Sequence, residues 1–264
     1  MDFTLSKYRS LLTALKRGGY ESVLPGQESI TEKEGRAVIL RHDVDRRPDR
    51  SLKTARIEAE IGYKAVYYFR AVPCSWNEGI IRKIAAMGHE IGYHYECLTT
   101  SRGDIDAAWE DFRINLEQLR KLTPVTSACM HGSPRSNWDS KDIWRKYDYR
   151  TAGVTFEPYI DTDFHRVFYL TDTGRRWDGW KVSVRDKIED RQDAWCADGL
   201  VFHSTDDVME GINKADFPEH LMITTHPQRW TDSPVGWVNE AVAQSVKNIV
   251  KRMLIRDRRQ DICR

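Results

Sequence analysis

The 264-residue sequence predicts an α/β fold built on a parallel sheet, and three observations support this prediction. Short apolar runs alternate with segments of helical periodicity, an order typical of parallel β-α units. Polar clusters directly follow several of the apolar runs, as they do at the carboxyl ends of parallel strands. The length suits one large domain, because single α/β barrels commonly reach about 250 residues.

The first elements are the clearest. Apolar residues at helical spacing over 8–15 predict a helix that the Gly18-Gly19 pair ends. The run Ala37–Leu40 indicates a buried strand leading into the polar segment 41–45. Pro48 suits the first turn of the next helix, so one β-α unit is complete.

The same pattern continues along the chain with decreasing clarity. It predicts helices at 48–62, 77–87, 105–119 and 238–254. It predicts further strands at 65–69, 89–94, 126–130, 150–156, 166–171, 180–184 and 220–225.

Composition excludes several classes of protein. Lysine and arginine total 41 and aspartate and glutamate 40, a balance that argues against a nucleic-acid or anionic-membrane surface. The longest charge-free run, 122–134, is polar and too short to span a bilayer. The N-terminus lacks the pattern of a secretion signal, and the five widely spaced cysteines include no CxxC pair. We therefore expect a cytoplasmic protein without a membrane span.

Reactive side chains follow four of the predicted strands. They are Asp43 and Asp45, His94, His131 and His226. Because the carboxyl ends of parallel strands meet at one edge, we expect these groups to share a cavity. Asp43 and Asp45 are two residues apart on an extended segment and so face the same side, whereas His42 faces the other.

Each of these residues also has an ordinary structural interpretation. Aspartates at strand ends cap helices or bind arginines, and single histidines often bond to backbone carbonyls. Only the joint pattern favours a site. We expect the remaining histidines to be structural: His42, His89, His165, His203 and His220.

The segments that carry these residues resemble those of a known family. Four segments resemble the successive motifs of the polysaccharide deacetylase superfamily (NodB homology, carbohydrate esterase family 4-like). They are HDVD at 42–45, GHEIGYH at 88–94, HGSP at 131–134 and ITTHP at 223–227. The resemblance identifies a divergent member and implies a distorted (β/α) barrel of about seven parallel strands. It implies one domain over 1–264, with an N-terminal helical extension (1–35), a deacetylase-like barrel (36–230) and a C-terminal closing helix (231–264).

The resemblance also implies roles for individual residues. Asp43 resembles the catalytic base, Asp45 the metal-binding aspartate, His94 the first metal-binding histidine and His226 the catalytic acid. Val44 separates the two aspartates, which are adjacent in the family, so their roles could be exchanged.

The family's second metal-binding histidine falls at Leu98, which cannot bind a metal. The third ligand is then His131 or Glu96, and we favour His131 because its strand end faces the same cavity. Arg135 is the candidate that orients the base.

The implied reaction is removal of an N-acetyl group from an amino sugar or related saccharide. The substrate would be a small molecule or an oligosaccharide. The reaction uses a divalent metal, for which mixed imidazole and carboxylate ligands favour Zn²⁺. Aromatic residues near the motifs could stack on sugar rings. These are Trp76, Tyr93, Tyr95, Trp138 and Trp230.

Two alternatives stay open. One is a metal-independent hydrolase of other C–N bonds, such as cyclic amides, which the missing histidine would favour. The other is a non-catalytic saccharide-binding homologue. A glycosidase is disfavoured, because carboxylates two residues apart on one strand can hardly flank a glycosidic bond.

Overall fold

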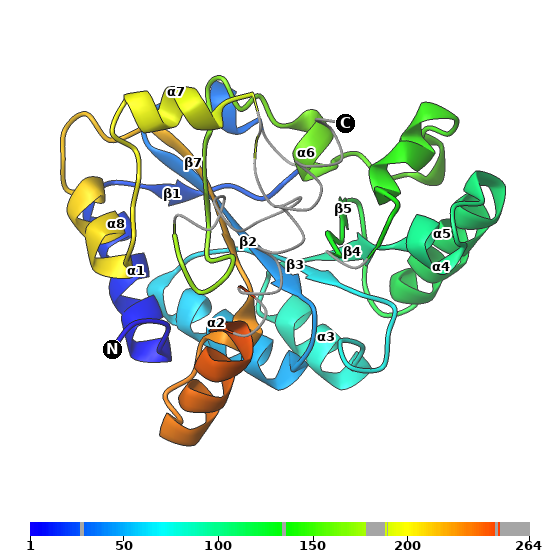
Figure 1. The fold of residues 1–264 in the computed structure, drawn as a ribbon, viewed down its shortest axis with the longest axis horizontal. Helices are drawn as coiled ribbons and strands as arrows, with labels where there is room; N and C mark the ends of the chain where they lie inside the picture. The colour runs from blue at the N-terminus through cyan, green and yellow to red at the C-terminus, as the bar shows by residue number, and fades with distance from the viewer. Residues whose placement is uncertain (27–28, 134–135, 178–187, 189, 246–247, 249–264) are drawn as a thin grey trace, which may run out of the picture.

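The computed structural model describes residues 1–26, 29–133, 136–177, 188, 190–245 and 248. It confirms the predicted α/β fold, a distorted barrel of parallel strands with helices outside (Figure 1). The strands are β1 (Glu21–Ser22), β2 (Ala37–Val44), β3 (Val66–Phe69), β4 (Glu90–Tyr95), β5 (Ala128–Met130), β6 (Phe168–Thr171) and β7 (His220–Thr225). Their order is β5-β4-β3-β2-β7-β6, with β1 beside the start of β2.

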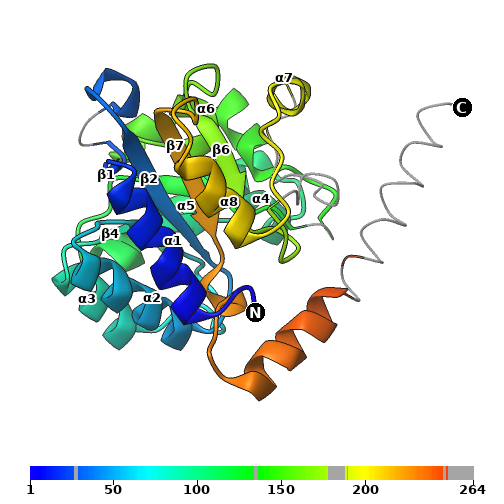
Figure 2. The same cartoon turned by 90° about the vertical axis from the view of Figure 1, so that its left-hand side faces the viewer.

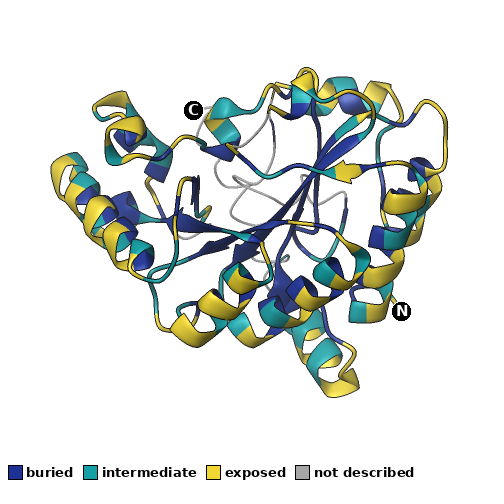
Figure 3. Cartoon of the chain, turned by 180° about the vertical axis from the view of Figure 1, so that it is seen from behind, coloured by how far each residue is buried: buried dark blue, intermediate teal, exposed yellow. Residues whose placement is uncertain are grey.

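Helices cover the outside of this sheet. The α-helices with defined bounds are α1 (Leu5–Arg17), α2 (Pro48–Ile61), α3 (Glu78–Ala86), α4 (Cys97–Thr100), α5 (Ile105–Arg120), α6 (Pro158–Asp161), α7 (Gln192–Ala197) and α8 (Thr205–Ile212). Short 3₁₀ helices are η1 (Ile30–Glu32), η2 (Ser140–Arg145), η3 (Tyr149–Ala152) and η5 (Pro227–Arg229). Figure 3 shows buried strands in the middle of the molecule and, around them, helices that carry the exposed residues.

The helix ends follow the sequence signals. Pro48 opens α2, and Gly62 closes it with a φ of 90°, a left-handed conformation that glycine adopts without strain. The side chain of Asp104 accepts hydrogen bonds from two backbone N–H groups at the start of α5. Helix α1 buries its apolar residues and packs against α2 and α8.

The second half of the chain departs from the prediction in one segment. The strand predicted at 150–156 is wrong, because Tyr149–Ala152 forms a 3₁₀ helix and only Phe156 makes a parallel bridge, to Ser127. The apolar residues of this segment are packed in the core, but the segment does not form a strand of the sheet. The strand predicted at 180–184 lies outside the described residues.

The register of the ladders decides which side chains point into the barrel. Asp43 is paired with Tyr68 and Tyr68 with Gly92, so the three lie side by side on the inner face. A Cβ on Gly92 would lie 2.3 Å from the ring of Tyr68. Glycine is therefore required where the Tyr68 ring crosses β4, directly below the strand ends that carry the predicted site.

The C-terminal helix projects from the body (Figure 2). Residues 234–245 are helical, and the side chains of Val238 and Val242 on this segment are exposed. Two apolar residues of the predicted closing helix are thus exposed in the part of that helix that the structure describes. No described helix is both long enough and apolar enough to cross a membrane.

Candidate metal and catalytic site

Asp43 lies inside the barrel near the end of β2, where Arg41 holds it. Arg41 Nε and Nη2 donate to the two carboxylate oxygens of Asp43 at 2.9 and 2.8 Å, and both side chains are buried. The ring of Tyr159 lies 4.7 Å from the Arg41 guanidinium, and its hydroxyl accepts from Arg41 Nη2 at 3.2 Å. This arrangement fixes the Asp43 carboxylate in one orientation.

Asp45, His94 and His131 come together from the ends of β2, β4 and β5. His131 Nδ1 lies 3.2 Å from Asp45 Oδ1 and 3.3 Å from His94 Nε2, and His94 Nε2 lies 3.7 Å from Asp45 Oδ1. Ligands bound at zinc distances in a tetrahedron are about 3.3–3.5 Å apart. The spacing of these three atoms is thus close to that of ligands around one small divalent cation.

Residues around the site form hydrogen bonds with the atoms of His94 and Asp45 that face away from it. His94 Nδ1 donates to the backbone carbonyl of Cys129 at 2.9 Å, so its proton is on Nδ1 and the Nε2 lone pair faces the site. Gln228 Nε2 donates to Asp45 Oδ2 at 2.9 Å. Asp45 Oδ1 is buried without a hydrogen-bond partner, a cost that a bound cation would remove. The residues present therefore fit a metal.

Electrostatics favour the ionised form of Asp45. Burial opposes ionisation, but attraction to His131 and the close approach of the His131 and His94 rings hold the pKa of Asp45 well below its usual value. Asp45 is thus available as an anionic ligand at neutral pH.

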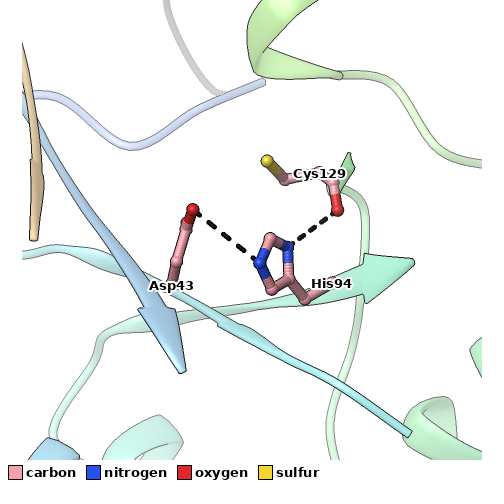
Figure 4. A group of neighbouring side chains, drawn as sticks. All are labelled: Asp43, His94 and Cys129. Carbon is pink, nitrogen blue, oxygen red and sulfur yellow. Dashed lines mark hydrogen bonds and ion pairs between the residues drawn. The ribbon is translucent and has the colours of Figure 1, made fainter. Parts of the chain in front are cut away.

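A second, deeper group could also hold a metal. Figure 4 shows Asp43, His94 and Cys129, whose ligand atoms lie within 4.8 Å of one another. This group uses the same His94 Nε2, so only one of the two positions can use that nitrogen at a time. The Arg41 guanidinium already neutralises Asp43 there, which disfavours a cation at the deeper position.

His226 follows β7, and Asp172 holds its ring from the end of β6. His226 Nδ1 lies 2.6 Å from Asp172 Oδ1, and the backbone N–H of His226 donates to Asp172 Oδ2 at 3.0 Å. Arg229 and the indole N–H of Trp230 also donate to Asp172. The Nδ1 side of the imidazole is therefore occupied, which leaves Nε2 as the nitrogen for chemistry.

The same contacts set the proton affinity of His226. Burial and the charge of Arg229 lower the pKa, but the charge and hydrogen bond of Asp172, together with the charge of Asp45, outweigh them. The pKa of His226 is therefore raised above its ordinary value. Asp172 itself stays ionised, because Arg229 and His226 lower its pKa against the effect of burial.

Two of the predicted sugar-binding residues are not available for stacking. Tyr95 is fully buried on the outer face of β4, where its ring packs on Phe112 and Trp144 and its hydroxyl donates to Glu157. Trp230 is also fully buried, and its N–H serves Asp172. Both predictions are wrong, because these rings fill the core.

The other predicted substrate contacts differ in exposure. Tyr93 is buried against Phe112, whereas Trp76 is partly buried and Trp138 is exposed. Arg135, the predicted partner of the base, lies outside the described residues. Sequence reasoning missed Arg41 in that role.

Among the comparisons with known proteins, only the comparison of structures found similar proteins. No known protein family matches the sequence, and no curated protein does either. The fold is similar to PdaA of Bacillus subtilis, a family 4 carbohydrate esterase, with 10% sequence identity and a TM-score of 0.43 over 89% of this chain and 82% of that chain. It is also similar to the D285S mutant of the peptidoglycan deacetylase PdaC of Bacillus subtilis, with 12% identity and a TM-score of 0.39 over 83% of this chain and 98% of that chain.

Proposed function

We propose that this protein is a metal-dependent hydrolase that removes an N-acetyl group from an amino sugar or related saccharide. One observation carries the proposal: ligand atoms of Asp45, His94 and His131 lie at tetrahedral spacing beside the Arg41-held carboxylate of Asp43. The sequence motifs around these residues support the same reaction. The proposal keeps the cytoplasmic location expected from the cysteine spacing.

In this reaction Asp43 is the general base. It accepts a proton as water attacks the amide carbonyl, and Arg41 keeps its carboxylate aimed at that water. Asp45, His94 and His131 would hold a divalent ion, which when bound would supply Lewis-acid polarisation of the carbonyl and a lower pKa for water.

His226 is the general acid. Its raised pKa favours the protonated form, and Asp172 on Nδ1 directs the Nε2 proton towards the leaving amine. The C–N bond breaks as the amine nitrogen takes this proton, and acetate and a free amine are the products.

The direct test is acetate release from N-acetylated amino sugars by the purified, zinc-loaded protein. The substrates are free N-acetylglucosamine, its nucleotide-linked form, a lipid-linked form and a chito-oligosaccharide. We expect release from at least one of them, loss of release with a chelator and recovery with Zn²⁺. Release that a chelator does not affect would instead favour the metal-independent alternative, and binding without release the non-catalytic one.

A second prediction concerns the pH dependence. Asp172→Asn removes the charge that raises the pKa of His226, so this pKa falls. Because His226 acts in its protonated form, activity is lost as pH rises through its pKa, and the alkaline limb of kcat should move to lower pH in the variant. We also expect kcat to fall about 100-fold. The profile of kcat against pH and the NMR titration of the His226 ring measure both effects. An unmoved alkaline limb would contradict the assignment of His226 as the acid.

A further inference from the structure

Arg70 joins the two strand ends that carry most of the candidate ligands. It follows β3, which lies between β2 and β4 in the sheet. Its Nη1 donates to the backbone carbonyl of Asp45 at 3.2 Å. Its Nη2 donates to both carboxylate oxygens of Glu96, at 2.7 and 2.9 Å, and its Nε donates to Oε1 at 3.0 Å. One guanidinium therefore fixes the segments on either side of it.

Glu96 in turn faces the outer nitrogen of His131. His131 Nε2 lies 3.9 Å from Glu96 Oε2, whereas its Nδ1 faces Asp45 and His94. The two ring nitrogens thus have different partners. If Nδ1 binds a cation, the proton of the neutral imidazole must be on Nε2, where the Glu96 carboxylate attracts it.

The contacts of Glu96 argue against its being a ligand itself. Both oxygens already accept hydrogen bonds from Arg70, and the side chains of Arg70 and Glu96 are only 18% and 14% exposed. The group with ligand spacing contains Asp45, His94 and His131. The choice between His131 and Glu96 that the sequence left open therefore falls to His131.

We propose that Glu96 and Arg70 are positioning residues of the metal site: Glu96 orients His131 for ligation through Nδ1, and Arg70 keeps Glu96 out of the coordination sphere. This rests on the metal site of the proposed function. Outer carboxylates of this kind fix the tautomer and orientation of a ligand histidine and typically change metal affinity by about 10–100-fold.

The first experiment measures Zn²⁺ affinity by competition with a chromophoric chelator, which requires no substrate. Glu96→Gln keeps the shape of the side chain and removes its charge, so we expect the Kd for Zn²⁺ to rise about 10–100-fold. His131→Ala should weaken binding more, because it removes a ligand. Glu110→Gln is the matched control, since Glu110 is exposed on α5, where it pairs with Arg113, and the Kd of this variant should equal that of the wild type.

The second experiment uses Co²⁺, whose visible absorption reports coordination number. Arg70→Met frees Glu96, and we expect the Co²⁺ spectrum to shift towards higher coordination as the carboxylate joins the site. Adding Glu96→Gln to Arg70→Met should restore the wild-type spectrum.

The outcomes separate this inference from the proposed function. If the wild type binds no Zn²⁺, the metal site itself is refuted. If the wild type binds Zn²⁺ but Glu96→Gln binds it equally well, only the orienting role of Glu96 is overturned. If Glu96→Gln weakens binding as much as His131→Ala does, Glu96 is a ligand and the inference is wrong. An unchanged Co²⁺ spectrum in Arg70→Met would overturn the role of Arg70.

Discussion

Replacing Asp43 by asparagine is expected to lower kcat about 1000-fold while the Kd for Zn²⁺ changes little. In the proposed reaction Asp43 is the base, and general-base catalysis contributes about 10²–10⁴-fold. Both of its oxygens accept hydrogen bonds from Arg41, whereas Asp45 Oδ1 has no hydrogen-bond partner and faces the two imidazoles. The structure therefore favours Asp43 as base and Asp45 as ligand, the assignment that Val44 left open in the sequence.

Asp45→Asn is the matched variant. It should raise the Kd for Zn²⁺ by more than the roughly 10–100-fold of an outer-residue change, because it weakens a direct ligand. Circular dichroism on both variants controls for folding, since Asp43→Asn leaves the buried Arg41 charge without its partner. If instead Asp43→Asn loses Zn²⁺ and Asp45→Asn retains it, the two roles are exchanged.

The fold was predictable from sequence where local and global signals agree. The run 37–45 is apolar, then polar, and is followed by Pro48, so strand, strand end and helix start all appear within a dozen residues. The segment 150–156 is interrupted by Gly153, which ends the 3₁₀ helix Tyr149–Ala152 with a φ of 70°, so no strand runs through it. Short apolar runs do not by themselves distinguish a strand from a packed loop.

The residues that hold Asp43 and His226 in place, Arg41 and Asp172, were missed, although the same rules could have found them. Arg41 is two residues before Asp43 on one strand, so the alternation that pairs the two aspartates also places Arg41 on their side. Asp172 directly follows the predicted strand at 166–171, at the edge where the other reactive groups gather. Its contact with His226 joins residues far apart in sequence, and spacing alone does not indicate such a contact.

The aromatic predictions failed for a different reason. Tyr95 directly follows one of the motifs on β4, but neighbouring residues on a strand face opposite sides. Trp230 follows the short helix η5, and its ring is fully buried. His94 points into the barrel, so Tyr95 must point outwards, against α5. The same alternation, applied to each motif residue, is enough to exclude Tyr95 from the amino-acid sequence alone.

The alternation of side chains along β2 also places His42 on the outer face of the strand, where its contacts stabilise the fold. His42 points away from Asp43 and lies 2.5 Å from the buried carboxylate of Glu58, on α2. The hydroxyls of Tyr8 and Tyr67 donate to the same carboxylate at 2.5 and 2.6 Å. One carboxylate thus links α1, α2, β2 and β3 behind the site.

Glu58→Ala is expected to lower the free energy of unfolding by about 3–5 kcal/mol, because it leaves these buried donors without an acceptor. For a chain of this size the melting temperature should fall by about 10 °C. Glu60→Ala on the same helix is the control, since Glu60 is exposed, pairs with Arg9 and should contribute at most about 1 kcal/mol. Urea unfolding followed by circular dichroism measures both variants.

The difference in stability between wild type and Glu58→Ala should depend on pH if the charge of Glu58 is its cause. Burial raises the pKa of Glu58, but attraction to His42 and the hydrogen bonds from His42 and Tyr67 outweigh it, so the pKa in the folded state is below its ordinary value. Such a group stabilises the fold above the pKa of the unfolded chain, and this contribution is lost as pH falls through the folded-state pKa. The gap in stability between wild type and Glu58→Ala should therefore be full at neutral pH and narrow in acid. A gap that is constant with pH would mean that lost packing, and not the charge of Glu58, accounts for the destabilisation.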